Sequence, residues 1–86
     1  MRVIGENLRL AREKAGYTLL DVERVANYMF GYQLPSWMLE KWENEHWDDS
    51  GYPTREQLQL LAAIYDCPVA VFSAEPLDFL RAEADL

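Results

Sequence analysis

The chain has 86 residues, half of them apolar, which is enough for one small domain that buries roughly 60–65% of its unfolded surface. The single Cys67 excludes an internal disulfide, and with the single His46 it supplies too few ligands for structural zinc, so we expect no metal and no cofactor. The net charge of −7 is unusual for a nucleic-acid-binding protein. No apolar run could span a membrane and the start lacks the layout of a signal peptide, so we expect a cytoplasmic protein with no membrane partner.

The charge is unevenly distributed along the chain. Residues 75–86 hold four acids against one base. A second acidic run comprises Glu40, Glu43, Glu45, Asp48 and Asp49. The bases among the first fourteen residues are Arg2, Arg9, Arg12 and Lys14, opposed by two glutamates. One end of the domain can therefore face phosphate groups in spite of the net charge.

Two helices are predicted in the first third of the chain. Residues 4–15 carry apolar side chains at the spacing of one helix face, namely Ile4, Leu8, Ala11 and Ala15. Gly16 should end this helix in a left-handed conformation. Thr18 is the N-cap candidate of the second helix, and Asp21 lies three residues later, as in a capping box. We expect its inward side chains to be Val22, Val25, Ala26 and Met29, and we expect the chain to turn near Gly31.

Pro35 is expected to be the first residue of a third helix over residues 35–45, because the N–H that proline lacks would be unpaired at that position. Leu39 and Trp42 should point inward together, and Met38 is a further candidate. The opposite face would present Ser36, Trp37, Glu40, Lys41 and Asn44.

The rest of the chain predicts a loop at residues 47–52 and further helical structure. Thr54 and Gln57 form a second capping box, followed by an inward stripe of Leu58, Leu61, Ala62 and Tyr65. Pro68 opens a short apolar turn, and Pro76 begins a possible last helix over residues 76–86. The expected fold is an all-α compact bundle of five short helices containing a helix-turn-helix, with residues 1–74 as the domain and residues 75–86 as an acidic tail or short helix.

Three segments occur in the order found in one known family. They are IGENLRLAREKAGYTL, MLEKWENE and PTREQLQLLAAIYDCPVAVF. Together they resemble the Cro/Xre-type helix-turn-helix repressors, the lambda-repressor-like DNA-binding domains, over about residues 3–74. Two features depart from that family: the stretch from Thr18 to Glu43 is several residues longer than usual, and the segment after Glu45 is longer and acidic.

The resemblance implies a sequence-specific, repressor-like regulator that binds double-stranded DNA as a homodimer, with its third helix in the major groove. The DNA-binding candidates are Arg12, Thr18, Gln33, Ser36, Trp37, Lys41 and Asn44. Arg9 and Lys14 are further candidates for phosphate contacts. The alternative for the polar candidates is that they are ordinary solvated side chains. Glu40 opposes DNA binding unless it accepts a hydrogen bond from a cytosine amino group.

Trp37 leaves three alternatives open. It could lie over the core beside Trp42 and Trp47, anchor a protein interface, or contact a thymine methyl group. The dimer contact has its candidates in Val71, Phe72, Leu77, Phe79 and Leu80, although Phe72 is also a candidate for the core.

A rival interpretation is a helix-turn-helix scaffold that binds a protein, as an inhibitor or antitoxin-like partner would, through its acidic and aromatic residues. The acidic run from Glu40 to Asp49 would then face a basic partner, or else it is a solvated loop. We do not expect an enzyme, because the sequence has no Ser/His/Asp ordering, no glycine-rich phosphate loop and no metal-ligand spacing.

Overall fold

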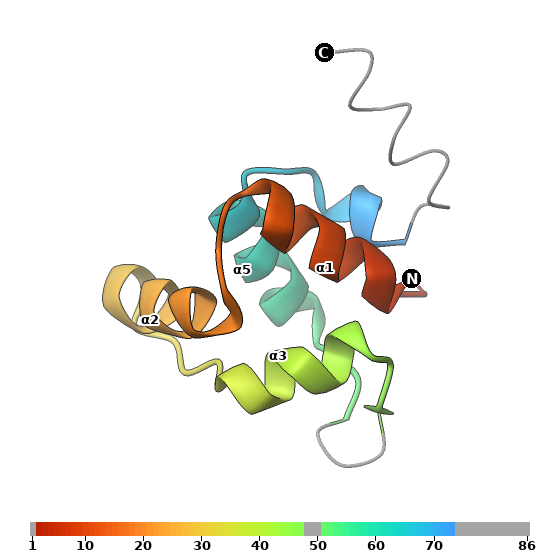
Figure 1. The fold of residues 1–86 in the computed structure, drawn as a ribbon, viewed down its shortest axis with the longest axis horizontal. Coiled ribbons are helices and arrows are strands. Elements are labelled where there is room, and N and C mark those ends of the chain that lie inside the picture. The colour runs from red at the N-terminus through yellow and green to blue at the C-terminus, as the bar shows by residue number, and fades with distance from the viewer. Residues whose placement is uncertain (1, 48–50, 74–86) are drawn as a thin grey trace.

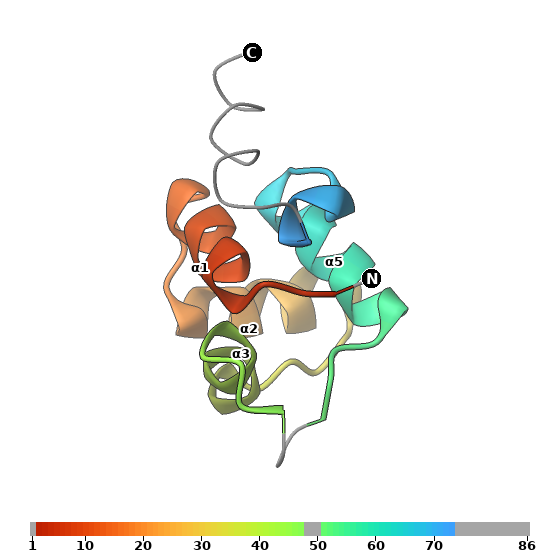
Figure 2. The same ribbon diagram turned by 90° about the vertical axis from the view of Figure 1, so that its right-hand side faces the viewer.

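The computed structural model describes residues 2–47 and 51–73. In these ranges the chain forms the helices α1 (Gly5–Lys14), α2 (Leu19–Phe30), α3 (Ser36–Glu43) and α5 (Arg55–Tyr65), followed by the 3₁₀ turn η1 (Val69–Phe72), and it contains no strand (Figure 1). Helix α1 packs against α3, α5 and η1, and α2 packs against α3 and α5. Figures 1 and 2 both show α3 below α1, at the lower edge of the bundle. The predicted all-α class is confirmed.

Both predicted capping boxes are present. The Thr18 hydroxyl accepts from the Asp21 N–H at 3.1 Å, and the Asp21 carboxylate accepts from the Thr18 N–H at 2.9 Å. Thr54 and Gln57 make the equivalent pair at 3.1 and 2.8 Å. These side chains satisfy N–H groups that a helix start leaves without partners, which explains why α2 and α5 begin where the sequence predicts.

The predicted turns after the first two helices are also confirmed. Gly16 has a φ of 86° and Gly31 a φ of 63°, the left-handed region in which glycine carries no steric penalty. After α1, the Gly16 N–H donates to the Glu13 carbonyl at 3.0 Å and the Tyr17 N–H to the Arg12 carbonyl at 3.2 Å. This pair of bonds is the Schellman arrangement that closes a helix end.

The bounds of the third helix differ from the prediction at both ends. Pro35 is the residue before the helix, with an extended ψ of 140°, and its carbonyl accepts from the N–H groups of Met38 and Leu39 at 3.0 and 3.2 Å. Ser36 is therefore the first helical residue. At the other end Glu45 has a φ of 57°, which is incompatible with a continuing helix, so α3 ends at Glu43 instead of residue 45.

The core lies between the helices and contains most of the side chains predicted to point inward. Of those predictions Leu8, Ala11, Val22, Ala26, Leu39, Trp42, Leu58, Leu61, Ala62 and Tyr65 are buried. Phe72 is buried too, with its ring edge-on to Tyr65 at a centroid distance of 6.2 Å, so its alternative as a core residue is confirmed. Val71 is half-buried, whereas Leu77, Phe79, Leu80 and the last predicted helix lie outside the described residues.

Two predicted core residues are exposed. Ala15 is the C-cap of α1 and points away from the bundle, because the helix ends one residue earlier. Met29 is 68% exposed, since the last turn of α2 extends beyond the helices that could cover it. Helical periodicity gives the direction of a side chain but not where the neighbouring element stops.

The start of α1 crosses the end of α3 at backbone contact. Gly5 is buried there, and a Cβ atom on it would lie 2.7 Å from the Trp42 carbonyl oxygen and still closer to that of Glu43. Its N–H donates to the Glu45 carboxylate at 3.1 Å. The C-terminal half of α3 is thus held tightly against α1.

Within the described ranges, no helix has the length and apolar character that crossing a bilayer requires.

Candidate functional site: the outward face of α3

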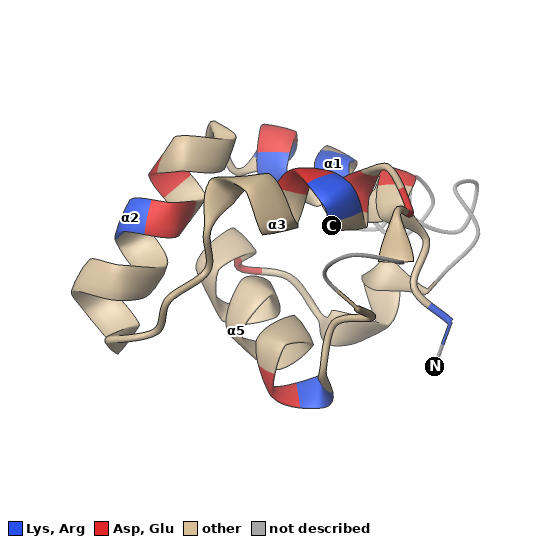
Figure 3. Ribbon diagram, turned by 90° about the horizontal axis from the view of Figure 1, so that it is seen from below, with Lys and Arg blue, Asp and Glu red and all other residues tan. Residues whose placement is uncertain are grey.

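The outward face of α3 carries a stripe of three predicted site residues. Trp37, Lys41 and Asn44 follow the i, i+4, i+7 spacing of one helix face, and Glu40 lies beside them. Trp37 is 54% exposed, so its alternative as a core residue is wrong. Figure 3 views the molecule from the α3 side and shows acidic and basic positions alternating on this helix. The face therefore combines an indole, an amide and charges of both signs.

The N-terminus of α3 is capped by a residue from another helix. Pro35 has no side-chain acceptor, and the Ser36 N–H donates instead to the carboxylate of Glu23, on α2, at 2.6 Å. A carboxylate at a helix N-terminus is stabilised by the helix dipole, so this bond fixes the start of α3 relative to α2. Glu23 is not among the residues predicted from the sequence. Its only signal is indirect: a proline before the helix leaves the first N–H groups without a local cap.

Gln33 lies before α3, in the turn that joins it to α2. With Glu23, Arg24, Asn27, Leu34 and Pro35 it lines a hollow of about 260 Å³ between α2 and the turn. Ser36 is half-buried at the beginning of α3. The structure thus brings Ser36, Trp37, Lys41 and Asn44 together on one helix and places Gln33 at the edge of this group.

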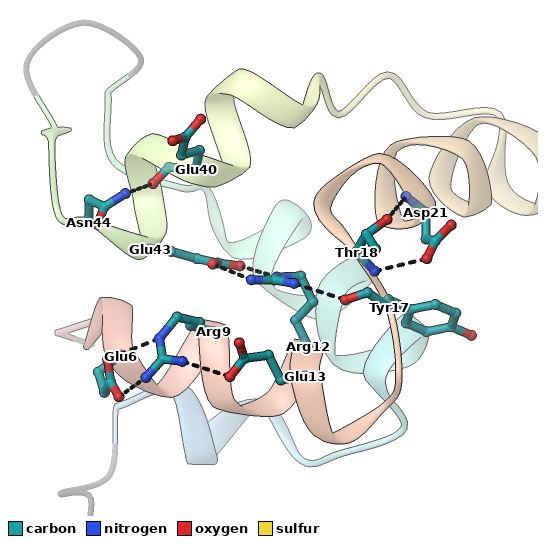
Figure 4. Close-up of polar contacts among 10 residues, drawn as sticks. All are labelled: Glu6, Arg9, Arg12, Glu13, Tyr17, Thr18, Asp21, Glu40, Glu43 and Asn44. Atoms are coloured by element: carbon teal, nitrogen blue, oxygen red, sulfur yellow. Dashed lines mark hydrogen bonds and ion pairs between the residues drawn. The ribbon is translucent and has the colours of Figure 1, made fainter.

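Arg12 occupies an internal position. Its guanidinium donates to both carboxylate oxygens of Glu43, at 2.7 and 3.0 Å, and to the carbonyl of Tyr17 at 2.8 Å (Figure 4). The hydrogen bond with Glu43 is the largest cause of a raised pKa for Arg12. Arg12 therefore joins α1 to α3 and to the α1–α2 turn, and its contact with phosphate stays a prediction.

The same ion pair changes the predicted acidic surface. The Glu43 side chain is only 7% exposed, so it belongs to the interior and not to a solvent-facing acidic run. Glu40 and Glu45 are exposed, and Glu45 holds the Gly5 N–H. Asp48 and Asp49 lie outside the described residues.

Arg9 lies at the surface with its side chain 39% exposed, but two acids on its own helix compensate its charge. It pairs with Glu6 and, at 2.6 Å, with Glu13 (Figure 4). The hydrogen bond with Glu6 is the largest cause of its raised pKa. Lys14, the other phosphate candidate on α1, is exposed in the last turn. The net positive potential expected from this end of the chain is thus reduced by local ion pairs.

Thr18 and Asn44 both use their polar groups within their own helices. The Thr18 N–H is the largest cause of a lowered pKa at Asp21, whose carboxylate lies at the start of α2. The Asn44 amide donates to the Glu40 carbonyl at 2.9 Å, at the end of α3. This bond engages one of the two N–H hydrogens of the Asn44 amide.

The described residues carry seven Lys and Arg against nine Asp and Glu, a net charge of −2. Five of the seven excess negative charges therefore belong to residues outside the described ranges. The described part contains no group of three or more His, Cys, Asp or Glu residues placed to hold a metal ion.

Comparison with models of protein families, with curated proteins and with solved structures finds no match.

Proposed function

We propose that the chain is a sequence-specific DNA-binding regulator that places α3 in the major groove. The observation that carries the proposal is the stripe of the exposed Trp37 and Asn44 with the half-buried Lys41 between them, on a helix that follows α2 by a turn of five residues, Gly31 to Pro35. The major groove of B-DNA admits one α-helix, and a helix-turn-helix presents its second helix in this way. The described residues carry a net charge of −2, and the other five excess negative charges of the chain still oppose binding to phosphate.

The side chains of the stripe match the chemistry of base edges. Lys41 can donate to guanine or to a phosphate, the Asn44 amide can pair with adenine, and the Trp37 ring can contact a thymine methyl group. Glu40 accepts from a cytosine amino group or else opposes binding. With few uncompensated bases nearby, we expect only about two or three phosphate contacts for each copy and a correspondingly shallow salt dependence. Two copies on a palindromic site then supply the affinity that one lacks.

The proposal is tested by retaining genomic DNA fragments on a filter with the folded protein, at low and at physiological salt, and sequencing what is kept. We expect enrichment of a palindromic site, with weaker retention for Lys41→Ala and Ser36→Ala. Arg55→Ala is the matched control, because Arg55 is an exposed base at the start of α5. Failure to retain any fragment at low salt contradicts the proposal, and so does an equal loss for all three variants.

A second candidate is a protein partner with a basic surface. The exposed Trp37 and Glu40 lie one turn apart on α3, and an exposed indole beside a carboxylate is typical of an interface anchor with a charged neighbour. The variant Glu40→Gln distinguishes DNA from a basic protein as the partner, because binding changes in opposite directions in the two cases. It removes a repulsion from phosphate and strengthens DNA binding, whereas it weakens the binding of a basic protein isolated by cross-linking to the wild-type chain.

A further inference from the structure

The last turn of α2 is exposed on all sides. Tyr28 is 89% exposed, Met29 68% and Phe30 51%. Successive residues of a helix point about 100° apart, so three exposed neighbours mean that this turn projects beyond the bundle. Figures 1 and 3 both show the end of α2 as the outermost part of the molecule on that side. Large apolar side chains exposed together in this way mark an interaction surface.

This end of α2 adjoins the hollow described above. Arg24 and Tyr28 lie one turn apart on one face of α2, and Asn27 and Phe30 share the neighbouring face. Arg24 and Asn27 line the hollow, so the projecting rings stand directly next to it along the helix. The surface therefore has both a projecting aromatic part and a concave part, so in a two-fold contact the projecting part of each copy can face the concave part of the other.

The charge pattern indicates what covers this surface. The fifteen residues from Val25 to Leu39 contain no Asp, Glu, Lys or Arg, and this is the longest such stretch in the chain. Two copies of a chain with a net charge of −7 repel each other over most of their surfaces. The uncharged stretch is where they can approach with the least repulsion, and the hollow beside it is lined by one acid and one base, Glu23 and Arg24, which add no net charge.

We propose that two copies of the chain associate through the projecting end of α2, each placing its aromatic turn against the hollow of the other. The three exposed side chains of the turn offer on the order of 400 Å² per copy, about half of the ~800 Å² per partner in a standard interface. The dimer is therefore weak and depends on protein concentration. Its surface differs from the one predicted at Val71, Leu77, Phe79 and Leu80, and it does not rest on the DNA-binding proposal.

Sedimentation velocity of the full chain without DNA, over a wide range of concentrations, tests the proposal. We expect the sedimentation coefficient to rise with concentration from that of a monomer to that of a dimer. Association should strengthen or stay constant when salt is raised, because salt screens the repulsion between the copies. The double variant Tyr28→Ser and Phe30→Ser should weaken the association at least tenfold.

Leu20→Ser is the matched control, since Leu20 is 44% exposed at the opposite end of α2 and should leave the association unchanged. Met29→Glu gives a second disruption by adding a like charge to each copy, and circular dichroism shows that each variant is folded. A wild-type chain that stays monomeric, a dimer that survives both disruptions, or a dimer that salt dissociates overturns the proposal.

Discussion

Arg12 on α1 and Glu43 on α3 form a bidentate ion pair across the helix crossing, with side chains only 12% and 7% exposed. The third contact of Arg12, to the Tyr17 carbonyl, ties the α1–α2 turn to the same pair. Burying the two charges removes their hydration, which offsets much of the attraction between them. The main effect of the pair is therefore to fix the positions of α1 and α3, and it adds little net stability. The pair fixes the end of α3 that carries Lys41 and Asn44.

Removing one member of this pair should destabilise the fold strongly. Arg12→Met leaves the Glu43 carboxylate covered and without its partner, so we expect the free energy of unfolding to fall by about 3 kcal/mol. Urea denaturation measures the change. The double variant Arg12→Met and Glu43→Leu should recover at least half of the loss, because it removes the buried charge. Arg9→Ala is the control and should change stability little, because the Arg9 side chain is 39% exposed and its ion pairs lie at the surface. A single variant as stable as the wild type contradicts this account of the pair.

Gly5→Ala should also destabilise the protein, through steric contact. The added methyl group would meet the carbonyl oxygens of Trp42 and Glu43, and backbone atoms cannot give way as a flexible side chain can. We expect a loss of about 2–3 kcal/mol in thermal or urea unfolding. Gly16→Ala has open space around it and only an unfavourable φ, so it should cost about 1 kcal/mol. Equal losses for the two variants would show that α1 and α3 are less closely packed than described.

The first capping box should make stability dependent on pH. The pKa of Asp21 is lowered from its ordinary 3.8, mainly by the N–H of Thr18. Because folding lowers this pKa, the ionised carboxylate stabilises the folded state at pH values above 3.8. This contribution is lost as the pH falls through the lowered pKa. Asp21→Asn should therefore reduce stability at neutral pH, and the difference from the wild type should vanish in acid. The Thr54 box uses Gln57, which does not ionise, so the cost of Thr54→Ala should not vary with pH in this way. A cost of Asp21→Asn that is constant with pH contradicts the assignment.

The thiol of Cys67 should react slowly. Burial, with a further contribution from the Asp66 carboxylate, raises its pKa from 9.0 to about 11. Only the thiolate attacks an alkylating agent, so at pH 8 we expect iodoacetamide to label Cys67 about a hundredfold more slowly than a cysteine in an unfolded peptide. Mass spectrometry measures both rates. The rate should rise tenfold per pH unit well beyond pH 9, and a plateau near pH 9 would mean that the thiol is solvated.

The sequence predicts the local features of this fold well. Both capping boxes, the left-handed glycines and the stripes of Leu58 and Leu61 depend on residues within a few positions of one another, and all are present. The prediction that Met29 lies in the core is wrong. Helical periodicity does not reveal that α2 extends beyond the helices beside it.

Features that join distant parts of the chain could not be predicted. From the sequence, Arg12 is a candidate for a phosphate contact. In the structure it is paired with Glu43, which lies thirty-one residues away in the chain. Glu23 caps α3 only because the fold brings it against the N-terminus of that helix, thirteen residues later in the chain. The stripe of the candidate site was predictable, since it lies on one helix, but the partners that compensate the nearby charges were not.

The most direct test of the central claim is a titration of the ¹⁵N-labelled chain with a DNA fragment selected by filter retention, followed by NMR. If α3 reads the major groove, the amide signals of residues 36–44 and of Thr18 should shift together, and those of Arg55 at the start of α5 should stay in place. Shifts that leave α3 unaffected, or no shifts at all at low salt, would contradict the claim that this helix binds DNA.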